Sequence, residues 1–212
     1  MKIDRAGFPF IAAALAPAVA LVATRKYALA TPFAILGGFM AFFFRDPERQ
    51  VPQDPDIVVS PADGRVMIAG PSDRRWAPPG DWKQITIFLS PLDVHMNRTP
   101  IAGRVTRVDY RRGRFLPAYN EGSNDNELNE VWVEYNGRTV VFRQVVGILA
   151  RRIVCRIGEG ETLERGQRVG LMKFGSRMDV FVPPDATLLV SVGDRVLGGE
   201  TVLARFGSAS AR

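Results

Sequence analysis

Residues 129–147 read NEVWVEYNGRTVVFRQVVG, and this stretch decides which kind of fold the chain can have. Apolar residues alternate with other residues on both sides of Asn136-Gly137. An Asn-Gly pair between two such runs is the strongest short-range signal for a β-hairpin. Further runs that favour strands lie at residues 57–60, 65–70, 83–90 and 104–110. The sequence therefore predicts a mainly β domain with few helices of its own.

The C-terminal third contains a weak internal repeat. Residues 161–174 read ETLERGQRVGLMKF and residues 191–206 read SVGDRVLGGETVLARF, and each segment places a glycine shortly before a valine and apolar residues after it. We expect two similar hairpin elements related by an approximate twofold, as in β-sandwich or barrel-sandwich folds. Residues 111–128 are polar, and we expect a mobile loop there.

The first 44 residues differ in composition from the rest of the chain. Residues 8–24 and 27–44 carry no charged side chain, and Arg25-Lys26 separates them. As a helix, each segment would be about 26 Å long, which is just enough to cross the hydrocarbon core of a bilayer. The alternative is a pair of buried core helices, but both segments are apolar on all sides. We therefore predict a membrane-associated helical hairpin at residues 1–44.

Residues 45–56, RDPERQVPQDPD, are polar and rich in proline, so we expect a linker before a β-rich domain at residues 57–212. The chain has 24 Arg and 4 Lys, and its net charge is +6. Next to an apolar hairpin, this charge favours contact with anionic lipid, and no nucleic-acid-binding motif is evident. The basic residues that flank the two segments favour a cytoplasmic location for the main domain.

The chain has one cysteine and one histidine, which limits its chemistry. Cys155 cannot form an internal disulfide, and no metal site of the Cys/His type is expected. A lone histidine is more often structural, but any imidazole acid–base chemistry must use His95, in SPLDVHMNRTP (90–100). Asp63, in SPADGRV (60–66), is either a turn residue that bonds its own backbone or a carboxylate that orients an imidazole.

Residues 171–183 read LMKFGSRMDVFVP, a strand pattern with Gly175-Ser176 inside it. Glycine in a strand marks a bulge or a close backbone approach. The Ser176 hydroxyl could attack the Gly175 carbonyl and form an ester if the fold supplied strain and a base. Removal of the serine α-proton would then eliminate the ester, cut the chain, and leave a residue that hydrolyses to a pyruvoyl group and ammonia.

The segment GQRVGLMKFGSRMDVFVP (166–183), together with SPADGRV, SPLDVHMNRTP and QVVGILARRIV (144–154), resembles phosphatidylserine decarboxylase of the short prokaryotic type. The similarity covers roughly residues 45–206, and the apolar hairpin also fits. Longer relatives have Gly-Ser-Thr at the cleavage point, where this chain has Arg177 in place of the threonine. They also have a His-x-x-His stretch, of which this chain has only His95, so the identity of the self-cleavage base stays open.

The resemblance implies an enzyme, a carboxy-lyase at the cell membrane that converts phosphatidylserine to phosphatidylethanolamine and carbon dioxide. It implies self-cleavage between Gly175 and Ser176 into a β chain, residues 1–175, and an α chain, residues 176–212, which stay associated. The cofactor would be a pyruvoyl group made from Ser176. His95 would transfer protons, and Asp63 would assist self-cleavage, either by orienting His95 or by acting directly. The partners implied are phosphatidylserine and membrane lipid; a homo-oligomer is left open.

The lysine residues of the chain are also consistent with a carbonyl cofactor that is made from the chain itself. Decarboxylation of an α-amino acid needs an electron sink beside the reacting carbon. Pyridoxal phosphate would need a lysine, but Lys2 and Lys26 flank the apolar segments, and Lys83 and Lys173 have no phosphate-binding glycine loop. We therefore expect no pyridoxal phosphate and no metal. Arginine suits the lipid phosphate or carboxylate, and the candidates are Arg98, Arg151, Arg152 and Arg177.

Three alternatives remain open at the level of sequence. A non-enzymatic, membrane-tethered barrel-sandwich binding module would suit the GD-x-V-x-GGE pattern at residues 193–200, and it predicts an intact chain of 23.4 kDa. A membrane serine peptidase would use Asp63, His95 and Ser176, and it predicts turnover of added peptides. A pyruvoyl-dependent decarboxylase of a free amino acid would have little use for the apolar hairpin.

Overall fold

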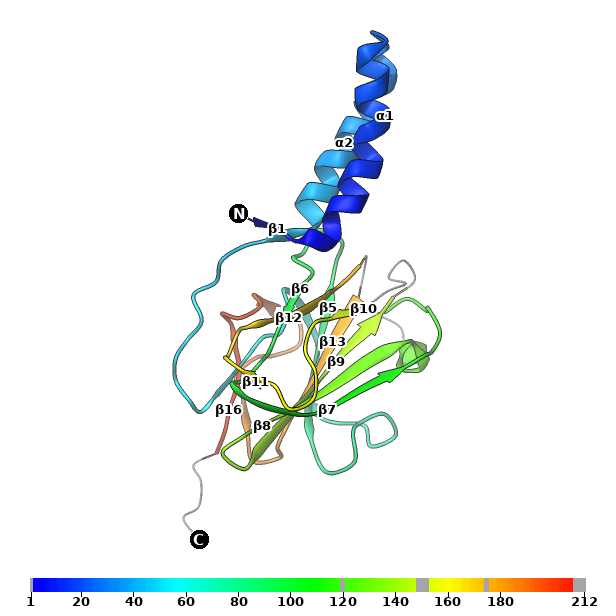
Figure 1. The fold of residues 1–212 in the computed structure, drawn as a ribbon. Helices are drawn as coiled ribbons and strands as arrows, with labels where there is room; N and C mark the ends of the chain where they lie inside the picture. The colour runs from blue at the N-terminus through cyan, green and yellow to red at the C-terminus, as the bar shows by residue number, and fades with distance from the viewer. Residues whose placement is uncertain (1, 119–120, 148–152, 174–175, 208–212) are drawn as a thin grey trace. The chain divides into compact units, whose positions relative to one another are not determined.

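The computed structural model describes residues 2–118, 121–147, 153–173 and 176–207 (Figure 1). The chain divides into two compact units, Met1–Glu48 and Arg49–Arg212. The first unit is helical and the second consists almost entirely of strands. The predicted fold class, a mainly β domain preceded by an apolar helical pair, is confirmed.

The first unit is a helical hairpin closed by a short β-ladder. Its elements are β1 (Lys2–Ile3), the 3-10 helix Arg5–Gly7, α1 (Phe8–Ala23), α2 (Tyr27–Phe43) and β2 (Arg45–Asp46). The two helices pack closely at Gly37, where an added Cβ would lie 2.2 Å from the Leu15 side chain. Because β1 pairs with β2 in antiparallel fashion, both ends of the hairpin lie together.

The surface of this hairpin is apolar. The helical stretch Arg5–Ala23 is long and apolar enough to cross a membrane, and only 17% of its apolar window is buried; Tyr27–Phe43 is apolar but shorter. Large side chains on both helices are exposed: Phe8, Leu15, Val19, Val22, Tyr27, Leu29, Phe33, Ile35, Leu36 and Phe42. A patch of this kind marks a lipid or protein contact, because water is a poor solvent for it. The hairpin therefore supports association with a membrane.

The second unit is built on one large curled sheet of eight antiparallel strands. In spatial order these are β11 (Thr162–Leu163), β7 (Gly103–Arg111), β8 (Leu128–Tyr135), β9 (Arg138–Val146), β13 (Ser176–Val182), β5 (Lys83–Leu89), β4 (Gly64–Pro71) and β15 (Arg195–Val196). One smaller sheet contains β10 (Ile153–Cys155), β12 (Arg168–Met172) and β6 (Met96–Arg98), and another contains β14 (Thr187–Leu188), β16 (Val202–Arg205) and β3 (Ile57–Val59).

The hairpin predicted at residues 129–147 is present as β8 and β9. Asn136 and Gly137 have φ of 50° and 71°, the positive values that a two-residue type I′ turn requires. Tyr135 and Arg138 pair across the turn, and the ladder continues to Leu128 and Val145 without a break. The local turn chemistry therefore fixes the register of two central strands of the large sheet.

The continuous strand predicted across residues 171–183 is wrong. The chain forms β12 in a small sheet, which ends at Met172, and then β13 in the centre of the large sheet, which begins at Ser176. Residues 174–175 lie outside the described part. Apolar alternation continues on both sides of the junction because each strand has one face toward the same core. Ser176 therefore lies where the chain passes from one sheet to another.

The polar segment 111–128 carries its own structure in its described part. It contains the 3-10 helix Glu121–Asp125 and a bridge between Arg114 and Asn126. The buried Asn126 amide donates hydrogen bonds of 2.8 Å to the carbonyls of Leu116 and Val146. The segment is thus attached to β9 at Val146, which pairs with Ser176.

The second unit repeats one arrangement twice. Residues 60–66 read SPADGRV and residues 99–105 read TPIAGRV. The carbonyl of the first residue in each turn accepts a hydrogen bond from a glycine of the C-terminal third, Gly199 at 2.7 Å and Gly166 at 3.0 Å. The strands repeat as well, because β3 and β4 pair with β16 and β15, just as β6 and β7 pair with β12 and β11. The repeat seen in the C-terminal third is therefore half of a larger internal repeat.

The core lies between the inner face of the large sheet and the small sheets. Its fully buried members come from strands of both kinds: Val58, Ile85, Ile87, Leu89, Val131, Val133, Val140, Phe142, Met172, Met178, Val180, Val182 and Leu203. Burying this apolar surface is the main force that holds the sheets together. Residues 176, 178, 180 and 182 alternate toward this core, so the side chain of Ser176 faces inward and that of Arg177 faces outward.

Candidate active site

Ser176 is the first residue of a strand that has neighbours on both sides. It pairs with Leu89 of β5 and with Val146 of β9. Its side chain is fully buried, and its hydroxyl has no hydrogen-bond partner among the described residues. A buried polar group without a partner costs about 1–3 kcal/mol. Such a group calls for an explanation, and a role in chemistry supplies one.

His95 lies just before β6 and is also buried, with 1% of its surface exposed. Its Nδ1 is 3.0 Å from the carbonyl oxygen of Asp93. Since a carbonyl can only accept, Nδ1 carries the proton of the neutral ring and Nε2 is the basic nitrogen. Met96 of β6 pairs with Leu171 of β12, so the same register continued by one residue would place His95 opposite Met172. Met172 is four residues before Ser176 in the chain.

A chain of side-chain amides ties β6 to the inner face of the large sheet. Gln144 donates a hydrogen bond of 2.9 Å to the Asn97 side chain and accepts one of 3.1 Å from Asn129. Gln144 is paired with Met178, two residues along the strand from Ser176. All three amide side chains are buried. Strand β6, which directly follows His95, is thereby fixed near the beginning of β13.

Asp63 lies in the turn before β4, and its carboxylate is held by two groups. Arg49 donates to both carboxylate oxygens at 2.9 and 2.7 Å, and the Gly198 N–H donates at 2.7 Å. Burial raises the pKa of Asp63 above its ordinary value, although Gly198 and Arg49 oppose this, and nearby Asp93 adds to the rise. The hydrogen bond from the His95 ring at Nδ1 goes to a backbone carbonyl, so Asp63 does not orient the ring through that atom.

The four candidate substrate-binding arginines fall into two groups. Arg98 is buried and donates a hydrogen bond of 2.9 Å to the Gly166 carbonyl. Arg177 donates to Ser123 at 2.6 Å, to Asn124 at 2.8 Å and to Asp179 at 3.0 Å, on the face opposite to the Ser176 side chain. Arg151 and Arg152, like Gly175, lie outside the described residues. Roles for these arginines in substrate binding stay predictions.

The outer face of the large sheet carries a row of polar side chains that the sequence analysis missed. Asp109, Glu130, Arg143, Asp179 and Thr86 are directly paired across five adjacent strands. Arg143 donates to Glu130 at 2.5 Å, and Thr86 donates to Asp179 at 2.8 Å. We call this row the charge ladder. The signal for it was a polar or charged residue at an outward position of each strand, but outward positions in an alternating pattern normally face water.

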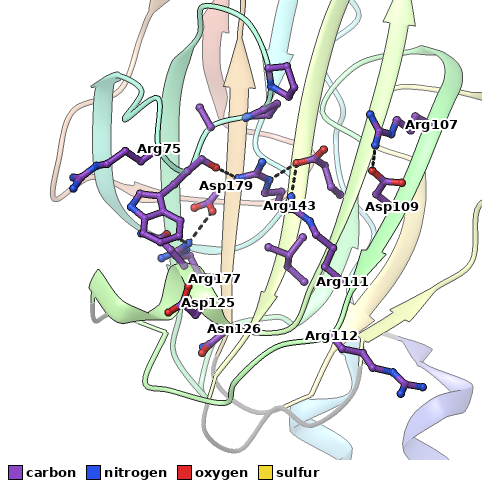
Figure 2. A pocket seen from close by; sticks show the side chains of 17 residues that line it. Arg75, Arg107, Asp109, Arg111, Arg112, Asp125, Asn126, Arg143, Arg177 and Asp179 are labelled. Atoms are coloured by element: carbon purple, nitrogen blue, oxygen red, sulfur yellow. Dashed lines mark hydrogen bonds and ion pairs between the residues drawn. The ribbon is translucent and has the colours of Figure 1, made fainter.

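The four charged residues of the charge ladder line a pocket with a volume of about 580 Å³. Figure 2 shows Arg143 near its centre, where it also donates to the Trp76 carbonyl, while Arg75 and Arg112 point away. Burial lowers the pKa of Arg143, and the nearby Glu130 carboxylate opposes that change. Because Arg143 and Arg177 are already paired with protein carboxylates, the contacts that this pocket shows are internal and stabilise the strands beside Ser176.

Comparison with known proteins identifies the family. A family model described as phosphatidylserine decarboxylase matches residues 36–204. The chain is 41% identical over 207 residues to a phosphatidylserine decarboxylase proenzyme of Desulfotalea psychrophila, with 96% of each chain covered. It is 44% identical over 207 residues to the proenzyme of Solibacter usitatus, with 97% of each chain covered, and 43% identical over 212 residues to that of Pelobacter propionicus, with 95% covered.

The chain belongs to the phosphatidylserine decarboxylase family. The resemblance drawn from the sequence motifs, and with it the prediction of an enzyme of this type, is confirmed. The family match includes Asp63, His95 and Ser176. Among the described residues, no group of three or more His, Cys, Asp or Glu side chains is placed to hold a metal ion.

Proposed function

We propose that this decarboxylase is synthesised as a precursor, cuts itself between Gly175 and Ser176, and converts Ser176 into a pyruvoyl group. The two-chain enzyme then converts phosphatidylserine to phosphatidylethanolamine and carbon dioxide. The observation that carries the proposal is the Ser176 hydroxyl, which is buried and unpartnered among the described residues at the first position of β13. The relatives named as proenzymes support the same conclusion.

The self-cleavage needs no outside reagent except one water molecule. The Ser176 hydroxyl oxygen attacks the Gly175 carbonyl carbon, the peptide C–N bond breaks, and the serine nitrogen takes a proton as the ester forms. Loss of the Ser176 α-proton then breaks the Cβ–O bond and releases Gly175 as the carboxylate end of the β chain. The dehydroalanine at position 176 tautomerises, and water converts it to the pyruvoyl group and ammonia.

Two groups of the chain are suited to move the protons in these steps. His95 has its Nδ1 proton held by the Asp93 carbonyl, which leaves Nε2 as the nitrogen that can accept a proton. Asp63 has a raised pKa, and a carboxylate with a raised pKa is a stronger base than an ordinary one. We assign the α-proton and hydroxyl-proton transfers to these two side chains, with His95 also acting on substrate.

The surroundings of position 176 fit the group that would be made there. The pyruvoyl carbonyl would supply the electron sink for loss of the carboxyl group. Its methyl would replace the unpartnered hydroxyl between Leu89 and Val146, both fully buried and apolar. The change removes the cost of an unsatisfied polar group from an apolar site.

The strand pairing supports continued association of the two chains after the cut. The α chain, residues 176–212, would contribute β13 to the middle of the large sheet, where it pairs with both β5 and β9. It would also contribute β15 and β16, which pair with β4 and β3 of the β chain. Separation would break all of these ladders at once. The apolar hairpin gives the enzyme access to a lipid whose acyl chains stay in the bilayer.

Intact-mass analysis and a decarboxylation assay test the proposal together. We expect wild-type protein to separate into two chains cut at 175/176, the smaller without a free amine, and to release carbon dioxide from carboxyl-labelled phosphatidylserine in vesicles. Ser176→Ala should remain a single chain of about 23.4 kDa and release none. Ser191→Ala, which alters an exposed serine of the same α chain, is the matched control and should behave like wild type.

Substitution of the two proposed proton-transfer residues should give partial losses in the same assays. His95→Gln should slow both cleavage and turnover, and Asp63→Ala should slow cleavage. An uncut Ser176→Ala chain that still releases carbon dioxide would end the proposal. Cleavage of added peptides by an uncut wild-type chain would favour a serine peptidase instead, and an uncut, inactive wild-type chain would favour a binding module.

A further inference from the structure

Arg49 is the first residue of the second unit, directly after the unit that holds the apolar helices. The sequence placed it in a polar linker, where an arginine would be solvated. Instead its side chain is only 9% exposed. It forms an ion pair with Asp63, whose side chain is 11% exposed. One guanidinium nitrogen, Nη2, lies 2.9 and 2.7 Å from the two carboxylate oxygens. The linker is therefore attached to the candidate active site through a buried charge pair.

The charges around Asp63 come from several elements. Arg49 itself also faces Glu200 at 3.5 Å. Asp93, in the loop before β6, is near enough to disfavour the charged form of Asp63, and it is paired with Arg195 at 3.4 Å. Arg49 thus binds Asp63 directly, while Asp93 acts on Asp63 and Glu200 faces Arg49.

The internal repeat indicates that the ion pair is not needed to build the turn. In residues 99–105 the position of Asp63 is taken by Ala102. Both turns close with the same side-chain hydrogen bond, from Ser60 to the Ala62 carbonyl at 2.6 Å and from Thr99 to the Ile101 carbonyl at 2.8 Å. A buried charge pair added to only one of two equivalent turns points to chemistry rather than to folding.

We propose that Arg49 is a positioning residue for self-cleavage, which holds Asp63 as an oriented carboxylate so that it can take part in proton transfer at Ser176. The inference rests on the proposed function. It assigns a role to the linker: cleavage competence depends on the segment that follows the membrane hairpin being bound in place. Without Arg49, Asp63 would be a buried carboxylate with Asp93 nearby, and its pKa would rise further, because the cation that favours its charged form would be gone.

The test is the pH profile of self-cleavage in the full chain. Precursor made by pulse labelling in cell-free translation with phospholipid vesicles is shifted to a series of pH values, and the appearance of the two chains is timed on gels. Removal of an opposite charge in contact with a carboxylate raises its pKa by about 1–3 units. For Arg49→Met we therefore expect the midpoint of the profile to move upward by about 1–3 pH units, with the wild-type rate regained at alkaline pH.

Two variants separate this role from simple support of the fold. Arg49→Lys keeps the charge and should restore most of the profile. Glu200→Gln removes a carboxylate that faces Arg49 but keeps an oxygen to accept the Gln50 N–H, and it should move the midpoint slightly downward. Arg138→Met removes a partly exposed ion pair with Asp56 elsewhere in the same unit, and it should leave the profile unchanged.

The outcomes distinguish this inference from the function on which it rests. If wild-type protein never cuts itself, the proposed function fails. If wild type cuts but Arg49→Met has the same profile, or loses rate equally at every pH, only the role of Arg49 fails. Should Arg49→Met not fold, Glu200→Gln still decides, because a purely structural role of Arg49 predicts no downward shift of its midpoint.

Discussion

Replacement of Arg143 by methionine should destabilise the second unit strongly. Arg143 lies in the charge ladder with 7% of its side chain exposed, and its partner Glu130 is 4% exposed. For charge centres about 4 Å apart at an effective dielectric constant near 20, the attraction is about 4 kcal/mol. Loss of Arg143 leaves Glu130 and Asp179 buried without this cation, although the more exposed Arg111 stays 3.4 Å from Glu130 and Arg177 still holds Asp179. Breaking a buried pair by removing one partner typically costs about 3–5 kcal/mol.

Thermal unfolding followed by circular dichroism in detergent measures this cost. A change of 1 kcal/mol shifts the Tm of a chain of this size by about 2–4 °C, so Arg143→Met should lower Tm by roughly 6–20 °C. Arg138→Met is the matched control, because its ion pair with Asp56 is more exposed and should be worth at most about 1 kcal/mol. Adding Glu130→Gln to Arg143→Met removes the buried carboxylate that has lost its main partner, and it should recover a large part of the loss.

An equal Tm for Arg143→Met and the Arg138→Met control would refute the reasoning. It would mean that water reaches the charge ladder through the pocket and screens its charges. A double variant no more stable than Arg143→Met would refute it in another way, because the loss would then come from packing of the arginine stem rather than from an uncompensated carboxylate.

Two further predictions concern the repeat and the hairpin. A Cβ added at Gly64 would lie 2.2 Å from the carbonyl oxygen of Phe88, and one added at Gly103 would lie 2.3 Å from the carbonyl oxygen of Glu134. Gly64→Ala and Gly103→Ala should therefore lower Tm by several degrees and by similar amounts. A small effect at both positions would contradict the close approach of the strands. Val19→Asp, on an exposed face of α1, should leave more protein in the supernatant after sedimentation with vesicles, whereas Val19→Leu should not; equal sedimentation would argue against insertion of this face.

The elements that the sequence predicted well are those specified by neighbouring residues. The Asn136-Gly137 turn needs positive φ at two successive positions, and the flanking alternation needs one buried face. Both requirements are local, so β8 and β9 could be assigned from a few residues. The apolar hairpin is equally local, because its length and composition are properties of one segment.

The features that the sequence did not reveal depend on contacts between distant residues. The passage of the chain between sheets near Ser176 was hidden because both sheets cover one core and demand the same alternation. The role of Arg49 was hidden because a polar, proline-rich segment has the composition of a linker whether or not one of its side chains is buried. Its partner, Asp63, is 14 residues away, and nothing in either segment alone indicates the pair.

The two halves of the second unit allow residues needed for the fold to be separated from residues added for chemistry. Both halves keep the Ser/Thr-Pro pair, the glycine and the valine of the turn, which set its hydrogen bonds and its close approach to the next strand. The residues that bear chemistry are not repeated: Ala102 corresponds to Asp63, and Asp56 corresponds to His95. Since the scaffold forms in both halves, neither side chain is required to build it. Substitution of Asp63 or His95 should therefore affect cleavage and turnover more than folding, whereas substitution of a repeated glycine should do the reverse.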